Sequence, residues 1–217
     1  MVLIRIEYKY TSMTGKIFIA SMNMRGKWAE KPYIEKLNVL NVTSAQGKDN
    51  LNRLAFSPMT PVEGGYKGFW NFESYYQSGK VFEGIPEDKV KNFWKNCKEA
   101  KRRYPNSKGK KVLYTTFYGD LEGQKLGYVE TRKKVYIPEY FSLIENKERL
   151  QYWKEKYEKG ENIIIYDFDG PRKKDGDVEC LEFDEKLFNE KLEYTKHPFG
   201  HGYVVAGAIM GLKMSYI

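Results

Sequence analysis

The segment NFESYYQSGKVF, residues 71–82, carries an acid, an amide and an amine at helical spacing. If it forms a helix, Glu73, Gln77 and Lys80 fall within about 60° of one another around the axis. Asn71 suits the N-cap position. Glu73 would lie in the first turn, where the positive end of the helix dipole stabilises a negative charge. A sheltered carboxyl group can act as a general acid or base, and a lysine as a nucleophile or an electrostatic clamp. The alternative is a polar face that only contacts water.

Aromatic residues surround this polar line. Phe69, Trp70, Phe72, Tyr75 and Tyr76 lie within one short stretch of the chain. An exposed helix seldom carries so many large rings, whereas polar groups between aromatic walls are typical of a ligand pocket. We therefore predict a pocket in which Trp70 and Tyr76 contact the substrate.

The order of these residues resembles the signature of the NADAR family. In that family a strand is followed by an aromatic, proline-containing loop and then by a helix reading Glu-x-Tyr-x-Gln-x-x-Lys. The matching positions here are Ser57-Pro58, Gly64-Gly65-Tyr66, and Glu73, Tyr75, Gln77 and Lys80. The resemblance covers residues 37–82 and 196–212.

The resemblance implies cleavage of an N-glycosidic bond at C1 of a ribose. The substrates it implies are phosphorylated intermediates of the riboflavin pathway or ADP-ribose attached to guanine in nucleic acid. It also implies that Glu73 and Lys80 are catalytic and that Gln77 positions the sugar. The chain departs from the family near its C-terminal end, where a Trp-Gly-Asp-Gly type motif is replaced by HPFGHGYVVAG with His201. The choice of substrate therefore stays open.

Two further acidic residues follow the apolar run in NIIIYDFDG, residues 162–170. A continuous apolar run predicts a buried central strand, with Asp167 and Asp169 at its carboxyl end. Ligands of open α/β sheets bind at such ends, so we predict that Asp167 is catalytic and that Asp169 contacts substrate. Arg172, in the basic turn that follows, is expected to contact phosphate. The alternatives are an Asp-Gly turn, a divalent-cation pair and a run of solvated charges.

The sequence has two histidines, His197 and His201, separated by a Pro-Phe-Gly segment. Pro198 and the two glycines disfavour a helix here, so we predict a loop. In that loop Gly200 and Gly202 present backbone N–H groups to an anion, and His201 contacts phosphate or donates a proton. The alternative is a structural turn that caps the apolar helix YVVAGAIMGL.

The chain is basic, with 37 Lys and Arg against 29 Asp and Glu, a net charge of +8. Such a surface attracts polyanions. Arg25, Lys27 and Trp28 place an aromatic ring beside two cations, and Arg102 and Arg103 lie in a second basic stretch. We predict nucleic-acid contacts by these residues. The alternative is a lysine-rich surface that is only solvated.

Hydrophobic periodicity and turn residues predict the surrounding elements. A strand pair is expected to turn at Thr14-Gly15. The predicted strands are residues 2–10, 16–20, 37–44, 111–119, 133–141 and 162–167. The predicted helices are residues 71–82, 86–104, 145–160, 184–192 and 203–212, and residues 57–68 are predicted to form a structured loop.

These elements predict a single mixed α+β domain. Residues 1–36 would extend it with a strand, and residues 37–217 would form a NADAR-like core with insertions. Cys97 and Cys180 have no partner at disulfide or metal spacing, which favours a reducing, cytoplasmic setting without a bound metal. No apolar run approaches the roughly 18 residues that cross a bilayer, so we expect no membrane partner.

The leading prediction is an N-glycosidase-like hydrolase with a phosphorylated ribosyl or ADP-ribosyl substrate, carried on DNA or RNA or free. No cofactor is predicted. Two alternatives are a non-enzymatic, basic nucleic-acid-binding protein and a sensor or sequestering protein for a nucleotide ligand.

Overall fold

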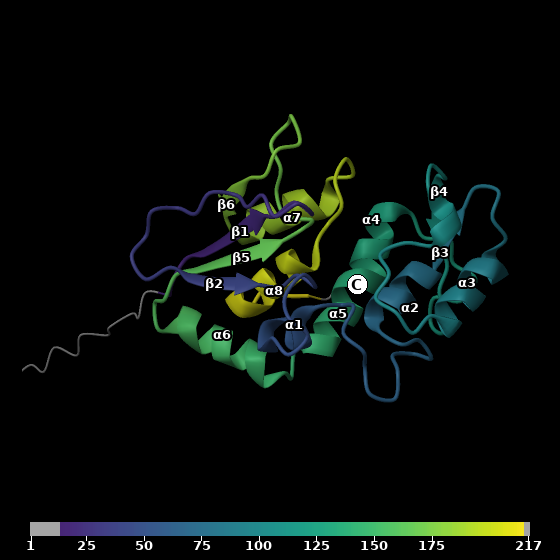
Figure 1. Cartoon of the computed structure of the whole chain (residues 1–217), viewed down its shortest axis with the longest axis horizontal. Helices are drawn as coiled ribbons and strands as arrows, with labels where there is room; N and C mark the ends of the chain where they lie inside the picture. Colours follow the sequence, from purple (N-terminus) through teal and green to yellow (C-terminus); the bar gives the residue numbers. More distant parts are fainter. Residues whose placement is uncertain (1–13, 215–217) are drawn as a thin grey trace, which may run out of the picture.

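A four-stranded mixed sheet forms one side of the molecule (Figure 1). The computed structural model describes residues 14–214. The strands, in spatial order, are β2 (Asn38–Asn41), β5 (Ile163–Asp167), β1 (Ile17–Ser21) and β6 (Cys180–Glu182). The first three run parallel and β6 runs antiparallel to β1. Parallel strands end at a common edge, where Ser21 pairs with Asp167.

Both faces of the sheet are buried, which explains the continuous apolar run of β5. Ile163 and Ile165 join the main core, which also contains helix α8 (His201–Met210). Ile164 and Tyr166 face a smaller cluster on the other side, where the Tyr166 hydroxyl donates a 2.9 Å hydrogen bond to the carbonyl of Ala29. The predicted central strand is confirmed.

Four helices lie next to this sheet (Figure 1). They are α1 (Leu51–Phe56), α6 (Glu148–Glu158), α7 (Glu185–Glu193) and α8. The predicted helices at residues 145–160 and 184–192 correspond to α6 and α7 and are confirmed. Gly160, just beyond α6, has φ +83°, the left-handed conformation in which glycine commonly follows a helix.

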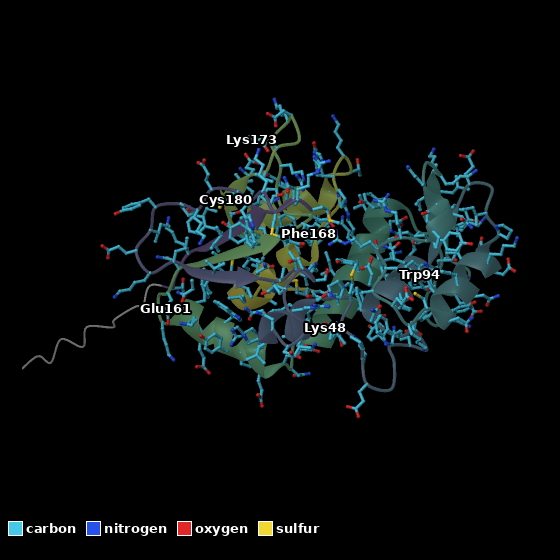
Figure 2. The ribbon with its side chains drawn as sticks, viewed as in Figure 1. Lys48, Trp94, Glu161, Phe168, Lys173 and Cys180 are labelled. Atoms are coloured by element: carbon cyan, nitrogen blue, oxygen red, sulfur yellow. The ribbon has the colours of Figure 1, made fainter. Side chains whose placement is uncertain are left out.

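A second group of elements lies beside the sheet (Figure 1). It consists of α2 (Phe72–Ser78), β3 (Lys80–Phe82), α3 (Glu87–Asn96), η1 (Pro105–Ser107), β4 (Val112–Thr115) and α4 (Tyr128–Thr131). Figure 2 shows Trp94 among the helices of this group and Phe168 on the sheet side. One continuous cluster of buried side chains includes Ile165 of the sheet and Trp94 of α3, so both groups share a core. Helices together with a mixed sheet agree with the predicted α+β class.

Residues 133–141, predicted as a strand, are helical, so that prediction is wrong. A π-helix, η2 (Arg132–Tyr136), leads into α5 (Ile137–Ile144). The buried residues Arg132, Tyr136, Tyr140 and Ile144 recur every four positions, which is a helical period. Pro138 occupies the first turn of α5, where a missing N–H is tolerated.

The helix predicted over residues 71–82 is also shorter than expected. It ends at Ser78, and Lys80–Phe82 form strand β3, with Lys80 opposite Thr115 of β4. Gly79 ends the helix, and a Cβ on it would lie 2.5 Å from the ring of Phe117. Glycine is therefore required here by close packing, and Lys80 belongs to a strand.

Two other predictions differ from the structure in extent, and a third is not tested by it. α3 ends at Asn96, so residues 97–104 extend beyond the helix. β4 covers only the first part of the predicted strand at 111–119. Within the described chain β1 has a neighbour on each side, β5 and β6, and its predicted partner at residues 2–10 lies outside the described residues. No helix within residues 14–214 is long and apolar enough to cross a membrane.

Candidate functional site

A pocket of about 410 Å³ lies where the carboxyl edge of the sheet meets the second group of elements. It brings together segments from six parts of the chain: the loop after α1, the region of α2 and β3, the segment around η1, α4 with η2, the end of β5, and the start of α8. The lining residues are Pro58, Met59, Glu73, Gln77, Lys80, Phe82, Arg102, Arg103, Ser107, Tyr128, Tyr136, Asp167, Phe168, Asp169, Pro198 and His201. The acid, amide and amine identified in the sequence therefore line one cavity.

Glu73 stands in the first turn of α2. The Asn71 side chain caps this helix by accepting a 2.8 Å hydrogen bond from the backbone N–H of Ser74. Gln77, one turn later, donates a 2.7 Å hydrogen bond from Nε2 to Glu73 Oε1 and so fixes the carboxyl group. Burial raises the pKa of Glu73, and the positive charge of Lys80 and the Gln77 hydrogen bond oppose that rise.

Lys80 projects from the first position of β3. Its Nζ lies 5.4 Å from the centre of the Tyr76 ring, so Tyr76 supports the amine through a cation–π contact. Burial lowers the pKa of Lys80, while Glu73 and Asp169 act in the opposite direction. Within residues 14–214 no carboxylate lies within ion-pair distance of this Nζ. The ammonium group is therefore free to bind an anionic ligand.

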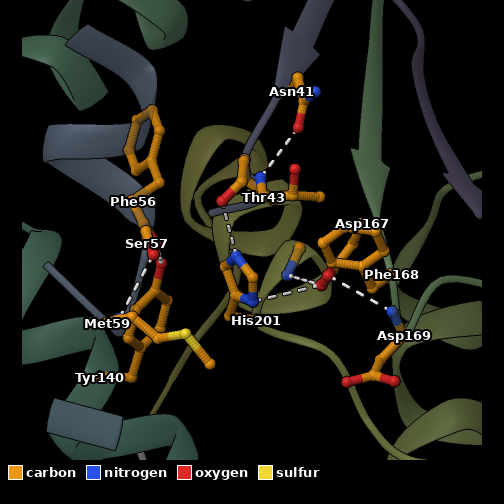
Figure 3. Close-up of polar contacts among 12 residues, drawn as sticks. Asn41, Thr43, Phe56, Ser57, Met59, Tyr140, Asp167, Phe168, Asp169 and His201 are labelled. Atoms are coloured by element: carbon orange, nitrogen blue, oxygen red, sulfur yellow. Dashed lines mark hydrogen bonds and ion pairs between the residues drawn. The ribbon is translucent and has the colours of Figure 1, made fainter. Parts of the chain in front are cut away.

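The two carboxylates at the end of β5 have different environments (Figure 3). Asp167 is only 1% exposed, and its Oδ2 accepts a 2.7 Å hydrogen bond from the backbone N–H of Gly202. Asp169 is open to solvent on one side, yet its carboxyl group also lines the pocket. Desolvation, followed by the charge of Asp167, raises the pKa of Asp169 to about 6. Asp169 is thus the more accessible of the two carboxyl groups, and Asp167 is held by its bond to α8.

His201 begins helix α8 and lines the pocket. Its Nδ1 lies 3.4 Å from Asp167 Oδ2, and its Nε2 lies 2.9 Å from the carbonyl oxygen of Val42. Its ring packs edge-on against Tyr140, with ring centres 5.8 Å apart. Both nitrogens therefore face oxygen atoms, which fixes the ring across the end of the sheet.

The loop predicted around His201 ends at Gly200, and His201 and Gly202 form the first turn of α8, so the prediction is wrong for these two residues. Gly200 is the N-cap residue of α8, and the backbone N–H of Gly202 donates to Asp167, so this N–H is not available to an external anion. A Cβ on Gly200 would lie 2.3 Å from Asp167 Oδ2, and one on Gly202 would lie 2.9 Å from Asp167 Cβ. These glycines are present because the acidic side chain approaches the helix closely.

Arg102 and Arg103 stand at the rim of the pocket as exposed side chains. The Arg102 guanidinium carbon lies 4.3 Å from the centre of the Phe168 ring. Arg102 also contacts the sulfur of Met24, which brings the loop carrying Arg25, Lys27 and Trp28 to the rim. The two arginines predicted as nucleic-acid contacts therefore belong to the pocket itself.

Several predicted site residues lie outside the lining. Trp70 is half-buried in the loop before α2, and Tyr76 lies behind Lys80. Arg172 is used within its own turn, where it donates to the carbonyls of Phe168 at 3.0 Å and Gly176 at 3.2 Å. The prediction that Arg172 is available to phosphate is therefore not supported by its contacts.

The loop of Arg25, Lys27 and Trp28 is also partly engaged. Lys27 forms an ion pair with Asp177, and Trp28 packs edge-on against Tyr166 with ring centres 4.5 Å apart. Arg25 is exposed. These contacts hold the loop on the sheet and leave Arg25 as its free cation among the three residues.

Among the lining residues that the sequence did not predict are two tyrosines, Tyr128 and Tyr136. Tyr136 was assigned to a strand, and Tyr128 lies in a stretch for which no element was predicted. The four-residue recurrence of Arg132, Tyr136 and Tyr140 was a signal that could have identified this helix. Tyr136 packs edge-on against Tyr76, with ring centres 4.7 Å apart, and so lies next to the support of Lys80.

Other hollows lack such a group of residues. A wider one of about 740 Å³ beside α3 contains one carboxylate, Glu99, which is exposed and paired with Lys101. Across residues 14–214 no cluster of three or more His, Cys, Asp or Glu side chains is placed to hold a metal ion. The 410 Å³ pocket, in contrast, brings Glu73, Asp167 and Asp169 together with Lys80.

Comparisons of the chain with protein-family models, curated proteins and solved structures found no match. The NADAR resemblance stays a prediction that rests on residues 37–82 and 196–212.

Proposed function

We propose that this chain is a hydrolase that cleaves the N-glycosidic bond of a phosphorylated ribosyl or ADP-ribosyl substrate, including ADP-ribose attached to guanine in nucleic acid. The observation that carries the proposal is the meeting of Glu73, Asp169 and an unpaired Lys80 in one pocket whose rim bears Arg102 and Arg103. The sequence resemblance points to the same reaction.

The reaction needs an acid that protonates the departing base and a negative charge that stabilises the positive sugar. The bond between ribose C1 and the base nitrogen breaks, its electron pair stays with the nitrogen, and that nitrogen takes up a proton. Water then adds its hydroxyl group to C1 and releases a proton. We assign the proton donor to Asp169, whose pKa of about 6 leaves a protonated fraction near neutral pH.

Glu73 is assigned to the developing positive charge on the sugar. A carboxylate near C1 stabilises that charge and can accept the proton released by water. Gln77 holds this carboxyl group through its hydrogen bond to Oε1, which keeps the oxygen atoms in one orientation. Asp167 acts through His201 and α8, as a positioning residue, because its Oδ2 is already bonded to Gly202.

Two alternative roles are open to Lys80, and experiment can separate them. Its charge can bind a phosphate or a sugar hydroxyl, or its neutral amine can attack the C1 aldehyde of an opened sugar, losing water to form an imine. Burial, which lowers its pKa, increases the neutral fraction. Trapping with borohydride would leave a stable adduct on Lys80 in the second case, and no adduct in the first.

The deciding experiment is incubation with an oligonucleotide carrying ADP-ribose on guanine, with ADP-ribosylated RNA, with NAD and with pyrimidine ribosyl phosphates. Products are identified by mass spectrometry. For the substrate that is cleaved, Glu73→Gln should reduce the rate by about 10²- to 10⁴-fold. Glu99→Gln, at an exposed acid outside the pocket, is the matched control and should retain the rate. Full hydrolysis by Glu73→Gln would refute the assignment, and nucleic-acid binding without any turnover would favour a binding protein.

A further inference from the structure

Tyr128 is an aromatic residue with 46% of its surface exposed at the pocket wall. It is the first residue of α4, which begins after Gly127. Buried rings such as Tyr136 belong to the core, but a ring that lines a cavity and remains open to solvent has a face available to a ligand. No role for Tyr128 follows from the reaction proposed above.

The Tyr128 ring is fixed from behind by Arg132. The guanidinium carbon of Arg132 lies 4.1 Å from the ring centre, at stacking distance. Since this cation covers one face of the ring, the exposed surface belongs to the other face and the edge.

Arg132 is 2% exposed, and no carboxylate within residues 14–214 pairs with it. Backbone carbonyl groups hold its guanidinium instead. Its Nη1 donates to the carbonyls of Leu192 at 2.8 Å and Tyr194 at 2.7 Å, and its Nη2 donates to that of His197 at 3.0 Å. These carbonyls lie at the C-terminal end of α7 and beyond it, where a helix dipole favours a cation. Arg132 therefore gives Tyr128 a rigid support that joins the two groups of elements.

A fixed aromatic ring beside cationic side chains is the arrangement that proteins use to stack nucleobases while arginines contact the phosphates. The pocket supplies those cations through Arg102 and Arg103. We propose that Tyr128 is a nucleobase platform, and that the pocket selects ligands in which a base accompanies the phosphates and the sugar. This selects nucleoside diphosphate sugars over sugar phosphates that lack a base, and it rests on the proposed function only for the location of the site.

The test is a calorimetric titration of two ligands, ADP-ribose and ribose 5-phosphate, into the full chain. Tyr128→Ala should weaken ADP-ribose binding by roughly 5- to 150-fold, the range for loss of one base stack, and should change ribose 5-phosphate binding less than about twofold. Tyr128→Phe keeps the ring and should bind ADP-ribose within about threefold of wild type. Thermal unfolding of each variant establishes that it is folded.

Tyr118→Ala is the matched control, because Tyr118 is 55% exposed and its ring packs against Lys91 and Lys95 outside the pocket. It should bind both ligands as wild type does. An equal loss for both ligands in Tyr128→Ala, no loss for either, or no binding of ADP-ribose to wild type would each overturn the proposal.

This outcome is separable from that of the proposed function. Tight, Tyr128-dependent binding of ADP-ribose without cleavage of any linkage would uphold the platform and reject the hydrolase. Cleavage with unchanged ADP-ribose binding in Tyr128→Ala would do the reverse.

Discussion

The backbone N–H of Gly202 donates a 2.7 Å hydrogen bond to Asp167 Oδ2, which joins the first turn of α8 to the carboxyl end of β5. The N-terminus of this helix is thus occupied by a side chain of the protein itself. Like charges repel, so we expect an anionic ligand to bind the cations of the lining, Lys80, Arg102 and Arg103, and not the N-terminus of α8.

Gly200→Ala should destabilise the fold. A Cβ at this position would lie 2.3 Å from Asp167 Oδ2, and because Gly200 has φ −80°, the difficulty is contact and not backbone conformation. Forcing a methyl group into a packed site costs about 1–3 kcal/mol. Urea unfolding measures this loss. Gly47→Ala, where a Cβ would meet nothing within 4 Å, should leave the unfolding midpoint nearly unchanged, and equal stability of the two variants would contradict the packing argument.

Asp169 should make the folded state less stable as pH rises. Its folded pKa of about 6 exceeds the roughly 3.9 of an unfolded aspartate, so the folded state binds more protons between these values. The stabilising contribution is fully present below about pH 3.9 and is lost as pH rises through about 6. Asp169→Asn removes the titration, so its stability relative to wild type should increase from pH 4 to pH 7.5.

Denaturant unfolding across this pH range provides the measurement. Asp49→Asn, at an exposed position outside the pocket, serves as the control for the general effect of removing one negative charge. A stability difference for Asp169→Asn that stays constant with pH would show that Asp169 titrates alike in both states.

Lys80→Met should shift the titration of Glu73 to higher pH. The charge of Lys80 opposes the rise that burial causes in the Glu73 pKa, and the substitution removes that charge while keeping a long apolar side chain. Carboxyl-carbon NMR with labelled glutamate reports the midpoint directly. Lys95→Met, at an exposed site on α3, should leave it in place. An unchanged Glu73 midpoint in Lys80→Met would mean that the two groups do not interact.

Arg132→Met should be among the most destabilising substitutions in the chain. It removes a buried cation and leaves the carbonyls of Leu192, Tyr194 and His197 without that donor. The hydrogen bond to Leu192 is buried and the other two are part-buried. An orphaned buried group costs about 1–3 kcal/mol, so we expect a loss of more than about 1 kcal/mol. Arg132→Lys should lose less stability, because lysine keeps the positive charge. It should still lose some, because lysine lacks the planar guanidinium that reaches several carbonyls at once.

Chemical denaturation of both variants beside Arg25→Met tests this expectation. Arg25 is exposed, so its removal should change the free energy of unfolding by no more than about 0.5 kcal/mol. Comparable losses of stability for Arg132→Met and Arg25→Met would show that the hydrogen bonds of Arg132 do not stabilise the fold.

The sequence by itself determined those helices and strands for which the hydrophobic pattern and the residues at the ends predict the same element. The apolar run of β5 was readable because a strand buried on both faces must be apolar throughout. Asn71 marked the start of α2, and Gly160 followed the end of α6, since capping depends on residues close in the chain. Glu73 and Gln77 were placed on one face for the same local reason, and their hydrogen bond agrees with it.

Tertiary structure decided the remainder. Lys80 reaches the pocket from a strand that pairs with β4, and residue 79 is a glycine because the Phe117 ring occupies the space a Cβ would need. Gly200 and Gly202 lie against Asp167, more than thirty residues earlier in the chain. The Gly202 N–H that was predicted to face an anion therefore donates to a carboxylate of the protein itself. Arg102, Arg103 and Tyr128 join the same cavity only through folding. Such contacts depend on which distant surfaces meet, and hydrophobic periodicity carries no information about that.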